Sequence, residues 1–301
     1  MLLKELLRTF IVNKKAKPRM TAKGKVDLHI HTNHSDGLLP PEKVVQLAAS
    51  AGLRTIAITD HDEIGALEVA MTIGAQLGVE VLAGAELSVS HNGFDIHILG
   101  YLLDFHHPRL LEFLHFFQGE RVRRVHHILE KLEAQGYAVP LETVLRKAGA
   151  GSIGRPHVAD ALVEAGHVAS YYEAFNRFIA DGKPAFVPKV RISAAEAVAI
   201  IHEAGGLACL AHPGQNLTES VILDVIKAGV DGIEIVHPKH SLAQRELYRR
   251  LAKTYNLLET GGSDFHGGRK EDERLGDYFI EYEKVEKLKA RQELLMQQQM
   301  K

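Results

Sequence analysis

His29, His31 and Asp36 lie close together in the stretch from Val26 to Gly37. Alternate residues of a β-strand point to the same face, so His29 and His31 would lie side by side. Asp36 follows in the turn that ends this strand. Imidazole and carboxylate ligands together suit Zn, Mn, Fe or Ni. The spacing predicts a metal-binding corner, but an amphipathic strand with polar residues on its wet face would show the same pattern.

Similar groups recur along the chain, each at or just after the end of a predicted strand. They are Asp60 and His61, Glu86, His97, His212, His237, Asp264 and His266. In an α/β barrel, catalytic groups come from the C-terminal ends of several strands, whereas a doubly wound sheet concentrates its site at one switch point. The pattern therefore favours a closed or nearly closed barrel with a site at its mouth.

The order of apolar and helical patterns gives the expected framework. Strands are predicted from residue 26 and at 54–59, 79–86, 94–100, 206–211, 232–236 and 257–262, with a hairpin-type turn at Asn92-Gly93. Helices are predicted at 40–51, 65–77, 193–204, 219–228 and 242–255, and Ser193 with Glu196 has the spacing of a capping box. Between about 104 and 190 only helical patterns occur, at 108–135, 141–148, 155–165 and 170–180. We therefore predict an α/β barrel interrupted by a helical insert.

Composition limits the classes of protein that fit. The 301 residues carry a net charge of −2, so no overall basic field would attract long duplex nucleic acid. The single cysteine, Cys209, lies in an apolar run and fits a reducing cytoplasm. No apolar stretch approaches the ~20 residues that span a bilayer, and residues 1–24 lack the pattern of a signal peptide. We predict a cytoplasmic protein without a transmembrane segment, and the sequence leaves its oligomeric state open.

Taken together and in this order, the groups at the strand ends resemble those of the PHP (polymerase and histidinol phosphatase) family over residues 25–270. The resemblance implies a distorted (β/α)7 TIM-like barrel with a site for two or three metal ions. We expect this barrel at 25–104 and 191–281 and a helical cap at 105–190. An N-terminal arm would occupy 1–24, and a helical tail at 282–301 would be a surface or oligomer element.

The resemblance also implies a ligand set. His29, His31, Glu86 and Asp264 would hold one ion, Asp36, His61 and His266 a second, and Glu86 with His97 and His212 a third. Asp60 would support the ligands or cap a helix. Mn²⁺ is the expected metal, with Fe²⁺, Zn²⁺ or Mg²⁺ as alternatives, because such donors accept several ions. Divalent ions a few Å apart lower the pKa of bound water and spread the charge of phosphoryl transfer.

The insert narrows the expected substrate. Its Gly-Arg-Pro-His sequence at 154–157 matches that of the PHP branch that acts on nucleotides. Arg155, at a predicted helix N-terminus, can bind phosphate bidentately and is a candidate for both binding and catalysis, with His157 as a further substrate contact. Arg121 and Arg124 would form a second anion pocket for a 5′-phosphate, although a run of basic residues on a helix is usually a solvated face.

The leaving oxygen needs a proton or a positive partner. His237, which follows a predicted strand, is a candidate, and a third metal ion is another. Its neighbour His240 is a candidate substrate contact.

Three functions remain open at this point. The resemblance favours a phosphatase that releases the 3′-phosphate of nucleoside 3′,5′-bisphosphates and trims short 5′-phosphorylated RNA from its 5′ end. A phosphatase for a small non-nucleotide monoester, such as histidinol phosphate, would use the same metal ligands, but the cap motif argues against it. A non-catalytic metal-binding or partner-binding module is the third, and the complete ligand set argues against that one.

Overall fold

The strands of the computed structural model curve into a nearly closed barrel. The structure describes residues 24–91, 93–149, 151–190, 192–214, 217–268 and 274–299. Residues 1–23 of the arm predicted at 1–24, and Asn92 of the predicted turn, lie outside the described residues. Within that part of the chain one sheet has the strand order β7-β6-β5-β4-β3-β2-β1-β8. The bounds are β1 Lys25–Ile30, β2 Leu53–Ile58, β3 Glu80–His91, β4 Phe94–Tyr101, β5 Leu207–Leu210, β6 Gly232–Val236, β7 Leu258–Gly261 and β8 Ile280–Glu281.

The pairing of the strands explains why the barrel is distorted. The β1–β2, β2–β3, β5–β6 and β6–β7 pairs are parallel, whereas β4 is antiparallel to both of its neighbours, β3 and β5. Just beyond β7, Phe265 forms a parallel bridge to Ile30, and its carbonyl accepts a hydrogen bond of 2.8 Å from the backbone N–H of His31. This contact brings the two ends of the sheet together. The predicted seven-stranded barrel is confirmed, with the two-residue β8 as an addition that is too short to show an apolar pattern.

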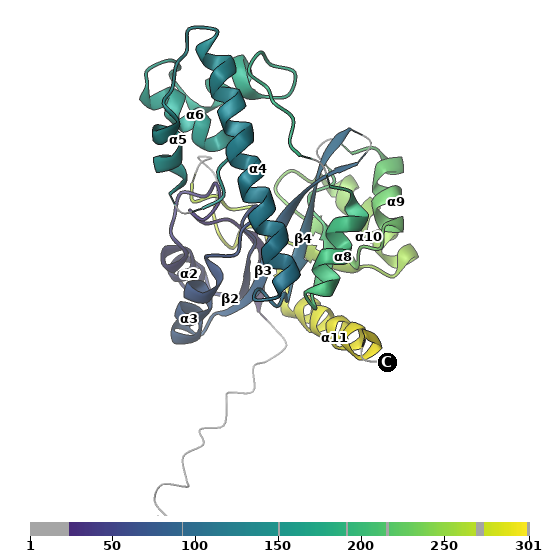
Figure 1. Cartoon of the computed structure of the whole chain (residues 1–301). Helices are drawn as coiled ribbons and strands as arrows, with labels where there is room; N and C mark the ends of the chain where they lie inside the picture. Colours follow the sequence, from purple (N-terminus) through teal and green to yellow (C-terminus); the bar gives the residue numbers. More distant parts are fainter. Residues whose placement is uncertain are drawn as a thin grey trace, which may run out of the picture.

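Amphipathic helices cover the outside of the barrel (Figure 1). Ser193 and Glu196 form the predicted capping box at the start of α8, where the Ser193 Oγ accepts from the Glu196 N–H at 3.2 Å. Val198 and Ile201 of this helix are buried against the sheet. The helices that flank the barrel are α2 Pro41–Ser50, α3 Leu67–Leu77, α8 Ala194–Glu203, α9 Glu219–Lys227 and α10 Leu242–Tyr255.

Helix α11 (Tyr282–Gln299) closes the barrel on the side away from the cap (Figure 1). Val285 and Leu288 are fully buried, and they belong to the same apolar cluster as Leu28, Leu99 and Tyr101 of the strands. The expectation of a purely surface or oligomer element is therefore wrong for the first half of this helix. Its sequence is rich in charge and glutamine, and only three or four apolar positions carry the packing.

The helical insert has a core of its own. It consists of α4 Pro108–Glu133, α5 Leu141–Ala148, α6 Arg155–Glu164, α7 Tyr171–Ala174 and the π-helical turn η1 Phe175–Ile179. Apolar residues of α4, α5 and α6 pack together, among them Ile128, Leu132, Val144 and Val158. We refer to α4–α7 and η1 as the cap, and Figure 1 shows that it lies over one end of the barrel. The single predicted helix at 170–180 is divided into α7 and the wider π-helical turn.

Polar contacts fasten the cap to the barrel. In α4, Gln118 Nε2 donates to Glu63 Oε2 at 2.6 Å. Between α5 and α6, the N–H of Ser152 donates to the carbonyl of His34 at 2.7 Å. Gly151 approaches the same carbonyl so closely that a Cβ atom would lie 2.3 Å from its oxygen, which explains the glycine at this position. No helix in the described ranges is long and apolar enough to cross a membrane.

Candidate active site

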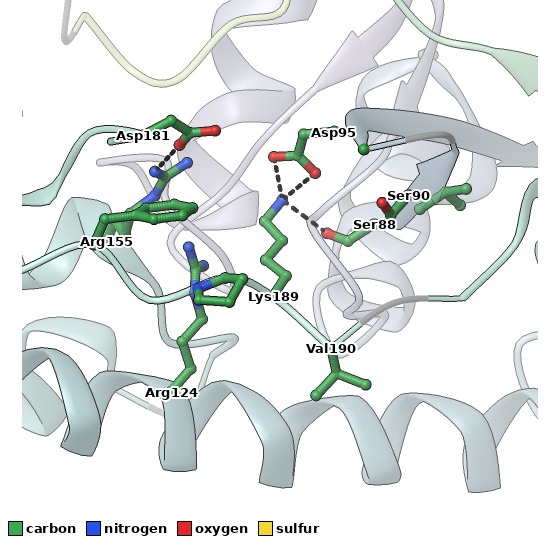
Figure 2. Close-up of a pocket in the computed structure, with 12 residues that line it drawn as sticks. Ser88, Ser90, Asp95, Arg124, Arg155, Asp181, Lys189 and Val190 are labelled. Atoms are coloured by element: carbon green, nitrogen blue, oxygen red, sulfur yellow. Dashed lines mark hydrogen bonds and ion pairs between the residues drawn. The ribbon is translucent and has the colours of Figure 1, made fainter. Parts of the chain in front are cut away.

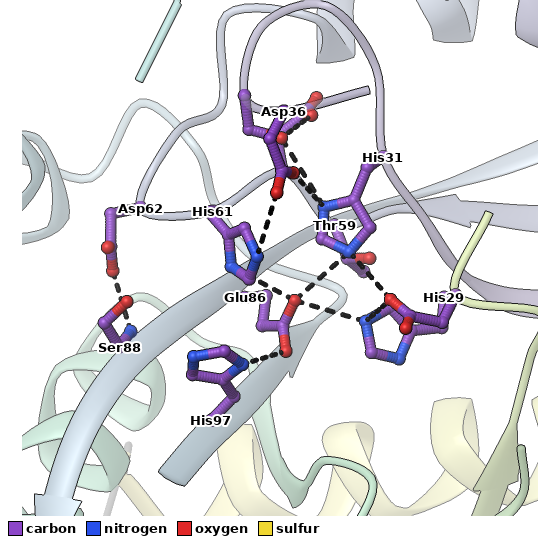
Figure 3. Close-up of polar contacts among 12 residues, drawn as sticks. His29, His31, Asp36, Thr59, His61, Asp62, Glu86, Ser88 and His97 are labelled. Atoms are coloured by element: carbon purple, nitrogen blue, oxygen red, sulfur yellow. Dashed lines mark hydrogen bonds and ion pairs between the residues drawn. The ribbon is translucent and has the colours of Figure 1, made fainter. Parts of the chain in front are cut away.

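A single buried carboxylate, that of Glu86, lies at the centre of a cluster of imidazoles (Figure 3). Its Oε2 lies 3.2 Å from a ring nitrogen of each of three histidines, and its Oε1 lies 2.7 and 2.9 Å from two others. In that order they are His29, His31, His61, His97 and His212. Burial raises the pKa of Glu86, but attraction to the surrounding histidines outweighs it and holds the pKa well below its usual value.

The register of β3 and β4 brings Glu86 and His97 together. Ser88 pairs with His97, and Glu86 pairs with Leu99, so Glu86 and His97 are diagonal neighbours across the antiparallel pair. Strand β3 extends to His91, five residues beyond the predicted end at Glu86. The alternation of Leu87 and Val89 with serines continues the strand past the carboxylate.

Two further carboxylates face the same histidines. Asp264 Oδ1 lies 3.5 Å from His29 Nε2 and 3.4 Å from His31 Nε2. Asp36 Oδ1 lies 3.3 Å from His266 Nε2. Figure 3 shows Asp36 and Glu86 on opposite sides of the His31 and His61 rings. The structure thus gathers all nine predicted ligands at the mouth of the barrel.

Four overlapping sets of these side chains could each hold a metal ion. Within each set the donor atoms lie within 4.8 Å of one another. The sets are His31–Asp36–His61–His266, His29–His31–Asp264, His29–Glu86–His212 and His61–Glu86–His97. His31 is thus common to the first two sets, and the predicted third set of Glu86, His97 and His212 is divided between the last two.

The cluster fits divalent cations by its own geometry. The buried atoms His31 Nε2 and His61 Nδ1 make no hydrogen bond within the described part of the chain, although each faces a Glu86 oxygen. Buried polar atoms are costly without a partner, and a metal ion would supply one. Mixed imidazole and carboxylate donors suit transition-metal ions. The assignment of individual ligands stays a proposal.

Buried acids hold the loop and rings of the cluster in place. Asp60 accepts hydrogen bonds from the N–H and Oγ1 of Thr32 and from the Oγ of Ser35, which fixes the loop that carries Asp36. Glu234 accepts from His29 Nδ1 at 3.0 Å and from the backbone N–H of His212 at 2.7 Å. A carboxylate on the far nitrogen of a metal-binding histidine fixes the ring and raises its basicity.

Glu234 is a residue of the site that the pattern of polar groups at strand ends does not indicate. It lies in the middle of the apolar strand β6 and is fully buried. A single charged residue within this apolar stretch is the one feature of the sequence that could have indicated its role. Burial raises the pKa of Glu234, but attraction to His29 and His237 outweighs it and brings the pKa to about 2. This acid is therefore ionised at neutral pH.

A Glu234→Gln variant is expected to bind metal about 10- to 100-fold more weakly, because the amide loses the charge that orients His29. Chelator competition against the wild-type protein measures this difference. Glu259→Gln is the matched control, since Glu259 lies on the neighbouring strand β7 and pairs with Lys284 instead. Unchanged metal affinity in Glu234→Gln would remove Glu234 from the metal centre.

The backbone is strained where some of these side chains are held. Asp62, His212 and Asp264 have φ angles of 49°, 22° and 51°. Left-handed backbone is unfavourable for residues other than glycine and tends to persist at functional sites. All three follow strands at the mouth of the barrel.

A cavity of about 230 Å³ joins the metal cluster to the cap, and we call it the central cavity. On the barrel side its lining includes Asp36, His61 and His97. On the cap side it includes four cations, Arg121, Arg124, Arg155 and Lys189, and two aromatic rings, Tyr171 and Phe175. A smaller outer cavity of about 60 Å³ shares Arg124, Arg155 and Lys189 as a common wall (Figure 2).

The two arginines predicted on α4 have different partners. Arg121 Nε donates to Asp62 Oδ2 at 2.9 Å, and Arg121 Nη2 donates to Ser88 Oγ at 3.1 Å, so it ties the cap to the barrel. Arg124 is buried, and its Nε donates to the carbonyl of Val187 at 2.8 Å. Burial and repulsion from Arg155 and Arg121 lower the pKa of Arg124 to about 9. Such a destabilised cation would gain from a bound anion.

Arg155 begins α6, as predicted, and is 17% exposed. Its Nη1 donates to the carbonyl of Ile179 at 3.2 Å and to Asp181 Oδ1 at 2.5 Å. Its guanidinium also lies 5.8 Å from the ring centre of Phe175. These contacts hold it between the central and outer cavities.

Three predicted histidines lie elsewhere, and none is among the described residues that line the central cavity. His157 is buried, and its Nδ1 accepts from the Gly154 N–H at 3.0 Å, so it caps its own helix. His240 Nδ1 lies 2.9 Å from the Ile235 carbonyl oxygen. His237 is fully buried, with Nε2 3.4 Å from Asp264 Oδ2. We therefore find no geometric support for direct substrate contact by these three.

The barrel and the cluster at its mouth define a class of metal-dependent hydrolase, and comparison with known proteins identifies the family. Residues 27–191 match the PHP domain, and the chain belongs to the PHP domain family. A 5′-3′ exoribonuclease of Haemophilus influenzae is 36% identical over 80% of this chain and 90% of its own length. A 3′,5′-nucleoside bisphosphate phosphatase of Chromobacterium violaceum is also 36% identical, over 81% of this chain and 89% of its own length.

A solved structure is also similar to this chain in fold. A candidate metal-dependent phosphoesterase from Bifidobacterium adolescentis superposes with a TM-score of 0.82 and 30% identity, covering 88% of this chain and 96% of that one. The family match, the names of these relatives and the cluster of metal donors all indicate the same kind of enzyme. The chain is a metal-dependent phosphoric ester hydrolase.

Proposed function

We propose that the chain removes the 3′-phosphate from nucleoside 3′,5′-bisphosphates and, by the same chemistry, trims short 5′-phosphorylated RNA from its 5′ end. The observation that carries this proposal is the central cavity. Metal donors line one side of it, and arginines line the other. A substrate with two phosphates could place the reacting one at the metal cluster and the other against Arg124 and Arg155.

The aromatic rings of the cavity fit the remaining part of such a substrate. Tyr171 and Phe175 have ring centres 5.0 Å apart, and both line the central cavity. Stacking on an aromatic ring is a common way to bind a nucleobase, and it contributes about 1–3 kcal/mol per base. A small phosphomonoester without a base would leave these rings unused.

The chemistry divides between the metals and the cap. When bound, divalent ions lower the pKa of water and offset phosphoryl charge, which is what ester hydrolysis requires. The cap residues hold the second phosphate and so orient the ester for in-line attack. We expect Mn²⁺ as the metal, and the names of the two relatives support a nucleotide or short RNA as substrate.

The choice between substrates can be tested directly. Phosphate release in Mn²⁺ is measured from adenosine 3′,5′-bisphosphate, adenosine 5′-monophosphate and histidinol phosphate. We expect the bisphosphate to be the preferred substrate by at least about 100-fold in kcat/KM, because it alone can occupy both ends of the cavity. Asp264→Ala is the control for release by contaminating phosphatases.

Two other results would change the proposal. Preference for histidinol phosphate would leave the hydrolase standing but contradict the role given to the cap. Cleavage of 5′-phosphorylated oligonucleotides without release from the bisphosphate would make the exonuclease activity the primary function.

A further inference from the structure

Lys189 lies where the chain returns from the cap to the barrel, in a segment without regular structure. Its side chain is 23% exposed, and Nζ lies 3.2 and 3.1 Å from the two carboxylate oxygens of Asp95. Nζ also lies 3.4 Å from Ser88 Oγ and 3.3 Å from His97 Nε2. Figure 2 shows the lysine pointing toward Asp95 and Ser88, away from α4. This side chain is thus held in one place by strand residues.

Lys189 differs from the other cap-side cations in its contacts. Arg124 donates to the backbone carbonyl of Val187 in the returning segment, and Arg155 donates to that of Ile179 in the cap. Lys189 instead reaches His97, a member of the metal cluster. It therefore lies between the cluster and the arginine pair that would take a second phosphate.

Hydrolysis of the phosphate ester needs a positive charge at the position of Lys189, between the metal cluster and the two arginines. A water oxygen bonds to phosphorus and gives up a proton to the solvent, and the bond from phosphorus to the ribose oxygen breaks. The ribose oxygen keeps the electron pair and then takes a proton from water. Charge builds up on this oxygen and on the phosphoryl oxygens in the transition state, and a fixed cation beside them lowers the barrier. His237, the other candidate for this role, is fully buried and faces Asp264.

We propose that Lys189 is a catalytic residue that contacts the reacting phosphate group and offsets the negative charge on its leaving oxygen. This proposal rests on the proposed function, which places the second phosphate against Arg124 and Arg155. Asp95 and Ser88 aim the lysine side chain into the central cavity. Arg155 serves the second phosphate instead.

Two substrates separate these roles. Adenosine 3′,5′-bisphosphate and adenosine 3′-monophosphate carry the same reacting phosphate, but only the first has a 5′-phosphate. With Mn²⁺, Lys189→Met is expected to lower kcat about 100-fold on both substrates, with Lys189→Arg restoring part of the loss. Arg155→Met is expected to lower kcat/KM on the bisphosphate alone. The metal content of each variant should equal that of wild type.

Lys183→Met is the matched control, because Lys183 is an exposed lysine of the same returning segment. It should behave as wild type. An unchanged kcat in Lys189→Met would overturn the proposal. So would a loss confined to the bisphosphate, which would assign Lys189 to the second phosphate, or a loss of bound metal, which would make its role structural.

A separate measurement tests Lys189 even if the proposed function is wrong. If the wild-type protein hydrolyses neither nucleotide, calorimetry with inorganic phosphate on the Mn²⁺-loaded protein still tests Lys189. Phosphate binding should weaken about tenfold in Lys189→Met and stay unchanged in Arg155→Met and Lys183→Met. Equal phosphate affinity in wild type and Lys189→Met would reject the assignment.

Discussion

A Glu86→Gln variant is expected to lose roughly 10³-fold in kcat/KM, which corresponds to about 4 kcal/mol of transition-state stabilisation. Both oxygens of Glu86 face histidine nitrogens within 3.2 Å. Glutamine keeps the shape but replaces one oxygen with an amide N–H₂, which cannot ligate a cation and repels it. Two of the four donor sets contain Glu86, so both should be impaired together.

Metal content by mass spectrometry and steady-state hydrolysis measure this effect in parallel. Asp231→Asn is the matched control, because Asp231 is also buried and pairs with a histidine, His202, at 2.7 Å. It lies outside the donor sets and should retain metal and activity. Full metal content with normal hydrolysis in Glu86→Gln would contradict the central role of this carboxylate.

The second large effect is expected at Arg124, where substitution should lower activity without lowering stability. An Arg124→Met variant should lose about 10- to 100-fold in kcat/KM on adenosine 3′,5′-bisphosphate, because a charged contact to the second phosphate is removed. It should lose little on adenosine 3′-monophosphate. The variant should also unfold at a temperature no lower than wild type.

The charge of Arg124 is held at a cost in free energy in the folded protein. The guanidinium is charged at pH 7 in both the folded and the unfolded protein. Burial and the neighbouring Arg155 and Arg121 lower the pKa of Arg124 to about 9 in the folded protein, so its charge is less favourable there than in the unfolded chain. Replacing it with an apolar side chain of similar length removes that penalty, as often happens at binding sites.

Thermal unfolding and the kinetics on the two nucleotides check both halves of this prediction. Arg177→Met is the control, since Arg177 is a more exposed arginine of the cap that pairs with Glu173. A lowered unfolding temperature in Arg124→Met, with unchanged discrimination between the nucleotides, would make Arg124 a structural residue.

The parts of the site that the strands position could be predicted from the sequence. The direction of a strand fixes which end of the barrel its later residues approach, so His29 in β1, Glu86 in β3 and Asp264 just after β7 lie at the same mouth. Resemblance to the PHP family supplied the grouping that spacing alone left open.

The supporting residues could not be predicted in the same way. Glu234 acts through the far side of His29, and that relation depends on a contact between strands β1 and β6. Lys189 lies in an irregular segment, where no periodicity indicates which way a side chain points. His157 is a residue for which the sequence predicted a role that the structure does not support. Its neighbours in sequence suggested a contact with substrate, but its ring caps the helix that it belongs to.

Helix α4 links the two apolar cores. Its 26 residues extend about 39 Å, with Leu110 and Leu114 in the barrel core and Ile128 and Leu132 in the cap core. A continuous helix cannot fold at one end and melt at the other without breaking its hydrogen-bond ladder. The cap is therefore expected to unfold together with the barrel, because the two apolar cores share this helix.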